Sequence, residues 1–171
     1  MAECELTTLM GCELVIGRYP RFLYNARGGS AVGEAQPGDA GQMNLHFPAE
    51  GTAIPALNGR TTRFLGLPLP PGLSVEIHPI RLNGRFEPAT GEMQLQFCAH
   101  FRFQVGLGPD LRYSAPDLLV DTLLTTETIR SQRHHRQGRR LQGVTTGVLV
   151  GSAVIEPTGE AWLDRFLGLP D

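Results

Sequence analysis

The sequence predicts an all-β, mainly antiparallel protein: a single flattened barrel or two-sheet sandwich of about eight or nine strands with a short C-terminal helix. From Met93 to Val105 apolar residues alternate with polar or reactive ones, and a period of two is typical of a strand with one buried face. The 21 Gly and 13 Pro fall largely between alternating runs, where turns belong. With 171 residues, we expect one β-rich domain over 1–171.

The first part of the chain predicts short strands. Residues 13–17 form an apolar run, and residues 22–26 place apolar side chains on alternate positions. Gly28 and Gly29 follow as a turn signal, so we expect residues 22–26 to form a hairpin with 30–35. Residues 43–47 alternate again and predict a further strand.

The middle of the chain predicts a long connection and then the main hairpin. Five prolines within residues 48–72 argue against a central strand there, so we expect a surface connection with at most one helical turn. Residues 73–82 alternate, with a change of phase at Pro79 that suits a bulge or a sheet edge. A turn signal at 87–92 then leads into the long strand 93–105, which spans about 43 Å and is expected to bend, carry a bulge or join two sheets.

After a Gly- and Pro-rich loop at 106–116, residues 118–129 and 141–155 predict a third hairpin with a polar tip. Gly143, Gly147 and Gly151 share one face of its second run, and we expect a bulky neighbour to cover them.

The C-terminal tail changes to a helical period. Trp162 and Phe166 are four residues apart, as are Leu163 and Leu167. Thr158 is available as an N-cap, and Gly168 followed by Leu-Pro is a helix stop. A short amphipathic helix is therefore expected to pack on the sheets.

Composition excludes several classes of protein. The net charge is −2 at pH 7, which provides no overall attraction to nucleic acid or anionic membrane. Cys4, Cys12 and Cys98 show no paired spacing, so neither a disulfide framework nor a zinc cage is indicated. The acidic N-terminal residues do not resemble a targeting segment, and no apolar run is long enough to span a membrane. We expect a soluble, cytoplasmic protein without a cofactor.

A cluster of basic residues is the clearest surface feature. All fifteen basic residues are Arg, and the segment 130–140 contains five of them with no acidic residue. Its candidate anion-binding residues are Arg130, Arg133, His134, His135, Arg136, Arg139 and Arg140. Guanidinium groups grip phosphates and carboxylates, and the imidazoles would strengthen the field as the pH falls toward about 6. Aromatic residues for base stacking are missing, so anionic lipid or an acidic protein surface is favoured over nucleic acid, which is an unlikely partner.

Cys98 and His100 are weaker candidates for chemistry. They lie about 7 Å apart on one strand face, too far for a direct nucleophile and base pair. With His46 or His78 from neighbouring strands they would suit a metal, although an ordinary polar face explains the same spacing. Nucleophile-elbow, phosphate-loop and two-histidine metal motifs are absent from the sequence, so an enzyme is the less favoured reading.

One hexapeptide occurs twice. Residues 63–68 and 165–170 are both Arg-Phe-Leu-Gly-Leu-Pro. We expect both copies to share one local structure, an apolar turn capped by a left-handed Gly and ended by Pro. Two symmetric binding loops are the alternative, and two exposed copies at one edge would favour it.

The order of elements, several β-runs and then a short helix, resembles that of lipocalin-like barrels, and the likeness implies one enclosed apolar ligand. The chain departs from that class because Gly-x-Trp is absent from the first strand and the single Trp is Trp162.

Three functions follow. The first is binding of an apolar or amphipathic small molecule, anionic head group included, by the side chains of Leu95, Phe97, Phe101, Phe103 and Val105. The second is an interaction or assembly module without a ligand that uses the arginine segment 130–140 and the two Phe-Leu turns as contact surfaces. Separately, glycine-containing strands with an exposed edge would pair between subunits, so a homodimer is an expected form. The third is an enzyme with a site around Cys98 and His100.

Overall fold

The structure is a computed structural model that describes residues 1–16, 19–106, 108, 110–142 and 146–170. Its main sheet has eight strands, all paired antiparallel. In spatial order they are β1 (Ala2–Thr7), β4 (Ser30–Pro37), β5 (Met43–Phe47), β9 (Leu73–Glu87), β10 (Glu92–Gly106) and β11 (Arg112–Ser114), with β12 (Leu118–Thr125) beside β10 and β6 (Thr52–Ala53) beside β4.

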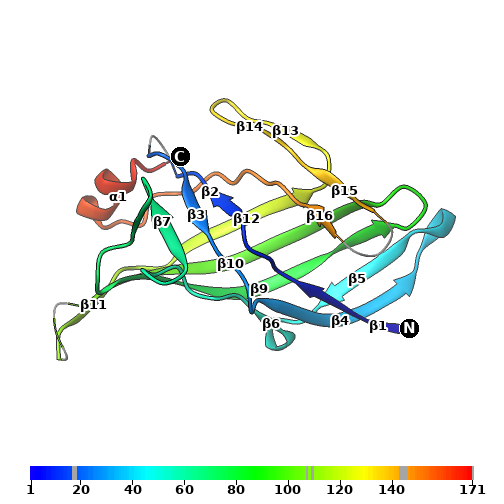
Figure 1. The fold of residues 1–171 in the computed structure, drawn as a ribbon, viewed down its shortest axis with the longest axis horizontal. Coiled ribbons are helices and arrows are strands. Elements are labelled where there is room, and N and C mark those ends of the chain that lie inside the picture. The colour runs from blue at the N-terminus through cyan, green and yellow to red at the C-terminus, as the bar shows by residue number, and fades with distance from the viewer. Residues whose placement is uncertain (17–18, 107, 109, 143–145, 171) are drawn as a thin grey trace.

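A smaller sheet lies over one end of the main sheet (Figure 1). Its strands are β2 (Cys12–Leu14), β3 (Phe22–Tyr24), β7 (Thr62–Phe64) and β8 (Leu67–Pro68). Two separate hairpins follow β12, namely β13 (Thr128–Arg130) with β14 (His135–Gln137), and β15 (Arg139–Gln142) with β16 (Thr146–Val148). The helices are the short turns η1 (Asp39–Gly41) and η2 (Ala49–Gly51) and the helix α1 (Ala161–Leu167).

The alternating segment 93–105 is confirmed as a strand, β10 of the main sheet, which pairs with β9 on one side and with β11 and β12 on the other. On β10, Met93 and Leu95 are 4% and 1% exposed and face the core. The bulge predicted at the change of phase near Pro79 is confirmed on β9: Cys98 pairs with Arg81 and Ala99 with Pro79, which leaves Ile80 unpaired. The extra residue changes the phase of β9, so that both Val75 and Leu82 face inward.

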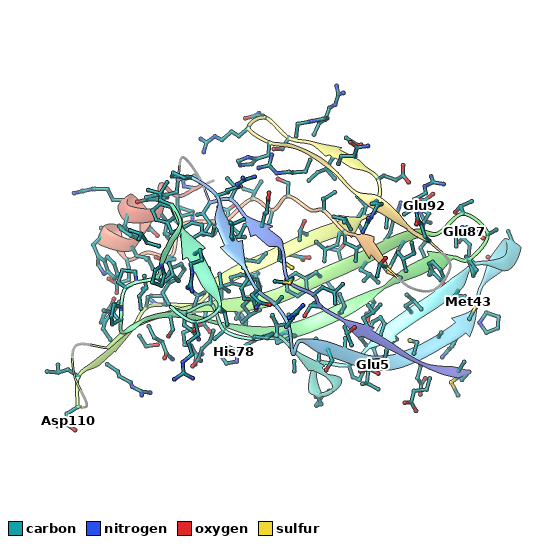
Figure 2. All side chains as sticks on the ribbon, viewed as in Figure 1. Glu5, Met43, His78, Glu87, Glu92 and Asp110 are labelled. Carbon is teal, nitrogen blue, oxygen red and sulfur yellow. The ribbon has the colours of Figure 1, made fainter. Side chains whose placement is uncertain are left out.

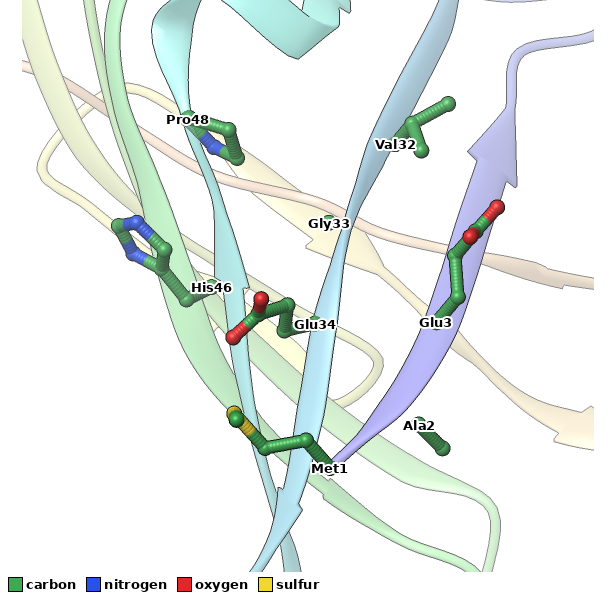
Figure 3. A pocket seen from close by; sticks show the side chains of 8 residues that line it. All are labelled: Met1, Ala2, Glu3, Val32, Gly33, Glu34, His46 and Pro48. Carbon is green, nitrogen blue, oxygen red and sulfur yellow. The ribbon is translucent and has the colours of Figure 1, made fainter.

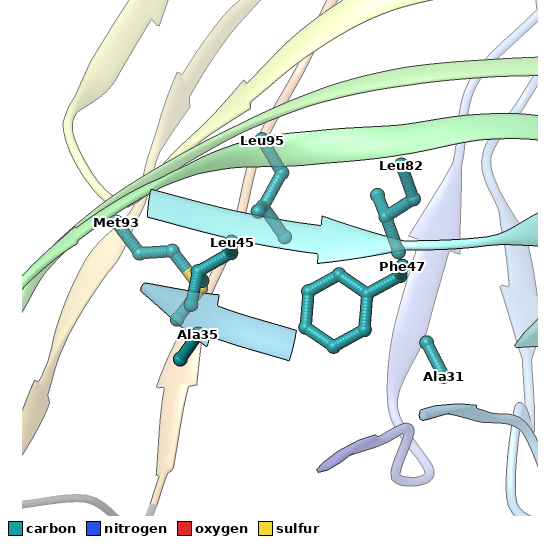
Figure 4. Packing of buried hydrophobic residues seen from close by; sticks show 7 residues of the cluster. All are labelled: Ala31, Ala35, Leu45, Phe47, Leu82, Met93 and Leu95. Atoms are coloured by element: carbon teal, nitrogen blue, oxygen red, sulfur yellow. The ribbon is translucent and has the colours of Figure 1, made fainter. Parts of the chain in front are cut away.

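The interior contains three packed clusters. The first joins β4, β5, β9 and β10 around Phe47 and Leu95 (Figure 4). The second lies between the two sheets around Tyr24 and Val75. The third seats the helix through Leu163 and Leu167, which confirms the predicted amphipathic helix and its stop at Gly168, where φ is +72°. The predicted N-cap is wrong, because the helix begins two residues later and Thr158 instead bonds the Asp164 carboxylate.

Several predicted pairings are wrong. Strand β3 pairs with β2 and β7, whereas β4 pairs with β1 and β5, so residues 22–26 and 30–35 do not form a hairpin. The proline-rich connection contains β7 and β8, which complete the smaller sheet. The main sheet does not close into a barrel, so the two-sheet alternative describes the fold.

The third predicted hairpin is replaced by the two small ones. Among the described residues of the returning segment, Val150 alone forms a bridge with β12, at Thr125. The side chains of Leu141 and Leu124 lie beside Gly147 and Gly151, as expected of a covered glycine face. Gly143 lies outside the described residues.

Candidate functional site

The predicted ligand-lining side chains are used in packing. Leu95 and Phe97 belong to the first cluster, and Phe101 and Phe103 contact both the second and the third. Val105 is half-buried near the end of β10, opposite Leu73 and Tyr113. These side chains hold the two sheets and the helix together.

The hollows found in the described part of the chain lie elsewhere. The larger, of about 610 Å³, is on the outer face of β1, β4 and β5 (Figure 3). Its lining residues are Met1, Ala2, Glu3, Val32, Gly33, Glu34, His46 and Pro48. A second hollow, of about 320 Å³, is lined by residues 58–60 and 70–74. Neither is lined by the predicted ligand-binding side chains.

The outer face around Cys98 and His100 is a network of charged side chains. Arg102 donates two hydrogen bonds to Asp117, at 2.8 and 3.0 Å, and these lower the pKa of that carboxyl. His78 lies opposite His100 in the ladder and contacts Glu76 at 3.0 Å. The pattern suits a stabilised sheet surface.

The metal alternative for this face has no support in the described residues. Cys98 is 7% exposed, and no group of three or more His, Cys, Asp or Glu side chains there is arranged to hold an ion. His46 is bonded to Asn83 at 2.8 Å. The Nδ1 atom of His100 is buried and has no hydrogen-bond partner among the described residues, but one such atom does not make a ligand set.

The basic segment forms a projecting structure, which we call the arginine hairpin: residues 128–140, comprising β13, β14 and the start of β15. Thr128, Ile129 and Arg130 pair with Gln137, Arg136 and His135. The turn between the strands is closed by hydrogen bonds between Ser131 and His134: the Ser131 amide and hydroxyl donate to the His134 carbonyl, and the His134 amide donates to the Ser131 hydroxyl oxygen. Figure 2 shows nitrogen-tipped side chains projecting from this hairpin away from the body of the molecule.

The arginines of the hairpin differ in their partners. Arg140 is tied to Glu127 at 2.6 Å and to Glu92 at 3.3 Å, and the Glu127 hydrogen bond raises the pKa of Arg140. Arg130, Arg136 and Arg139 are exposed and have no carboxylate partner among the described residues. These three guanidinium groups remain available to an external anion.

An acidic strand edge was missed by the sequence analysis. Glu3 and Glu5 alternate with half-buried Cys4 and Leu6 on β1, and Glu3 lies directly opposite Glu34 on β4. Carboxylates placed opposite each other repel. The alternation of Glu3, Cys4, Glu5 and Leu6 is the signal that would have found this strand.

The fold and surface define an antiparallel two-sheet protein with one cationic hairpin outside its packed body. Comparisons with known protein families, curated proteins and solved structures find no match to this chain. In the residues that the structure covers, no helix is both long and apolar enough to cross a membrane.

Proposed function

We propose that this protein is a non-catalytic interaction module that docks its arginine hairpin on an acidic protein surface. The single observation that carries this proposal is the isolation of the hairpin: β13 and β14 pair with each other and with no other strand among the described residues. A two-stranded hairpin alone is marginally stable in water, so an exposed one with free edges is suited to acquire a partner.

The charge of the hairpin supports an anionic partner. Arg130, Arg136 and Arg139 are exposed within a short segment, and the nearby carboxylates Glu127 and Glu92 are already occupied by Arg140. None of these three guanidinium groups has a carboxylate partner among the described residues, and the Arg136 Nη1 atom donates a hydrogen bond to the His135 carbonyl at 3.0 Å. Guanidinium groups attract carboxylates and hold them with paired hydrogen bonds.

The composition of the hairpin favours protein over lipid or nucleic acid. Its turn, residues 131–134, contains no apolar side chain that would enter a bilayer, and binding to membrane surfaces depends on buried apolar area as well as charge. Aromatic stacking surfaces for bases are also missing from 128–140. Open strand edges instead fit strand addition, in which backbone hydrogen bonds supply affinity and side chains supply specificity.

The ligand-binding and enzyme hypotheses have less support. The first would need the side chains of Leu95 and Phe97 to leave the core, where Leu95 is 1% exposed. The second would need Cys98, which is 7% exposed, to be reached by a substrate. Opening a packed core costs several kcal/mol. A function that uses exposed side chains avoids this cost, so we favour it over the other two.

The experiment measures binding of fluorescently labelled poly-L-glutamate to the full chain at low salt and at about 0.15 M salt. The test variant is Arg130→Gln, Arg136→Gln, Arg139→Gln. The matched control removes the same charge at exposed sites elsewhere, Arg27→Gln, Arg60→Gln, Arg112→Gln.

We expect the hairpin variant to lose about tenfold in affinity and the control less than about twofold, with weaker wild-type binding at the higher salt. Equal losses in the two variants would contradict the proposal. Hairpin-dependent binding to RNA or anionic vesicles, without binding to poly-L-glutamate, would overturn the choice of an acidic protein partner.

A further inference from the structure

We infer that the acidic surface is the free edge of strand β1 in a second copy of this chain, so that the arginine hairpin of one molecule adds to β1 of the next. This inference rests on the proposed function and names its partner.

The first step is the free edge. Among the described residues, β1 stands at one end of the main sheet and pairs only with β4. At the other end, residues 150–152 follow the outer side of β12: Val150 bridges Thr125, and the Thr122 hydroxyl donates to the Ser152 carbonyl. The described residues therefore cover one end of the sheet, and none of their strands pairs with the outer side of β1, where another strand can add.

The second step is charge. Glu3, Glu5 and Glu34 are exposed and lie on one face of β1 and β4. None of the three forms an ion pair within the part of the chain that the structure describes. Glu3 and Glu34 are direct neighbours across the ladder, so a cationic strand placed beside β1 would relieve their repulsion.

The third step is the exclusion of symmetric contacts. Pairing two β1 strands about Cys4 would place Glu3 opposite Glu5, and pairing two hairpins would bring arginines together. Like charges across an interface cost several kcal/mol. Contact between the acidic edge of one copy and the basic hairpin of another is the combination in which both charges are matched.

The fourth step is geometry. Figure 1 places the hairpin at one side of the molecule and β1 at the opposite side, so one molecule does not pair its own hairpin with its own edge. A contact between different surfaces of identical chains is head-to-tail, and repetition gives a ring or an open chain.

The test is light scattering coupled to size-exclusion chromatography, with full-length protein over a range of concentrations at low and high salt. The edge variant is Glu3→Gln, Glu5→Gln, and its matched control is Asp39→Asn, Glu156→Gln. The hairpin variant and its control are those of the poly-L-glutamate experiment.

We expect the wild type and both controls to assemble with rising concentration and to dissociate in salt, and the edge and hairpin variants to stay monomeric. Mixed in equal amounts, these two variants should form a species of two chains and none larger, because each keeps one half of the contact. Circular dichroism confirms that every variant is folded.

Two results would overturn the inference. One is a wild type that stays monomeric at low salt and high concentration, and the other is assembly that the edge variant leaves unchanged. In either case, hairpin-dependent binding to poly-L-glutamate would support the proposed function with a partner other than a second copy. If poly-L-glutamate binding did not depend on the hairpin, both the proposed function and this inference would be overturned.

Discussion

Asp117 illustrates how single side chains stabilise the outer face of the main sheet. Its carboxylate accepts two hydrogen bonds from Arg102, which lower its pKa below the ordinary value of 3.8, and the nearby imidazoles of His100 and His78 act in the same direction. The alternation on β10 predicted that Arg102 lies on a polar face. Its partner Asp117 comes from a different segment of the chain, so the sequence pattern could not predict this ion pair. The two hydrogen bonds from Arg102 account for the ionised Asp117 on this face.

We predict that Asp117→Asn lowers the free energy of unfolding by roughly 1 kcal/mol at pH 7. Because the folded-state pKa of Asp117 lies below 3.8, its contribution to the free energy of unfolding is complete above about pH 5 and is lost as the pH falls through the folded-state pKa. Urea unfolding from about pH 2 to pH 7 measures it, with Asp39→Asn as the control. A wild-type advantage that persisted undiminished at pH ~2 would contradict the assignment.

The repeated hexapeptide shows at the scale of an element that identical residues take different structures. In the first copy, Leu65 and Gly66 have φ of +51° and +80° and form the tight turn between β7 and β8. In the second, the equivalent Leu167 is the last residue of the helix and Gly168 caps it. The prediction of one shared structure is wrong, although the left-handed Gly is common to both.

The equivalent leucines of the two copies also differ in burial. Leu65 is 70% exposed, whereas Leu167 is 4% exposed. Figure 1 places β7 and the helix at the same end of the molecule. The surroundings, and not the six residues, select each structure.

We predict opposite effects of one substitution at these equivalent positions. Leu65→Asn should raise the free energy of unfolding by about 0.5–1 kcal/mol, because Asn tolerates the left-handed turn better than Leu. Leu167→Asn should lower it by more than about 2 kcal/mol, because it leaves a polar amide in the third cluster. Urea unfolding of both variants decides the matter, and shifts of the same sign would refute the two-structure account.

At the scale of the whole molecule, the C-terminal third is attached to the main sheet through a few close backbone contacts. The Leu141 amide donates to the Gly91 carbonyl at 2.9 Å, and the Thr126 hydroxyl and the backbone of Met93 are linked by hydrogen bonds. A Cβ atom at Gly91 would overlap the Leu141 carbonyl. These contacts bring Leu141 into the first cluster and leave β13 and β14 outside the body.

We predict that Gly91→Ala is more destabilising than Gly41→Ala. Both glycines have positive φ, +73° and +86°, but only Gly91 lies against backbone. Each substitution should cost about 1 kcal/mol for the left-handed conformation, and Gly91→Ala about 1–2 kcal/mol more for displacing Leu141. Urea unfolding and hydrogen exchange at the Leu141 amide measure this. Equal losses with unchanged exchange would show that the junction is unimportant.

The predictions that held concern patterns read within one segment. The alternation of β10, the change of phase near Pro79, the strand at 43–47 and the helix with its stop at Gly168 each depend on neighbouring residues. The alternation of side chains along a strand and the left-handed glycine that ends a helix both depend only on residues close together in the sequence. The arginine segment was likewise visible as a run of like charge.

The sequence by itself thus determined where the long strands of the main hairpin and the C-terminal helix form, and which of their faces are apolar. Only the tertiary structure decided which strands pair: β3 with β2 and β7, β4 with β1, and β1 with no second neighbour among the described residues. The physical reason is that strand pairing joins distant segments, and the winning partner depends on loop closure and on burial summed over the whole sheet. For the same reason the half-buried phenylalanines of β10 pack against the three clusters, and the acidic edge of β1 lies on a different side of the molecule from the basic hairpin (Figure 1).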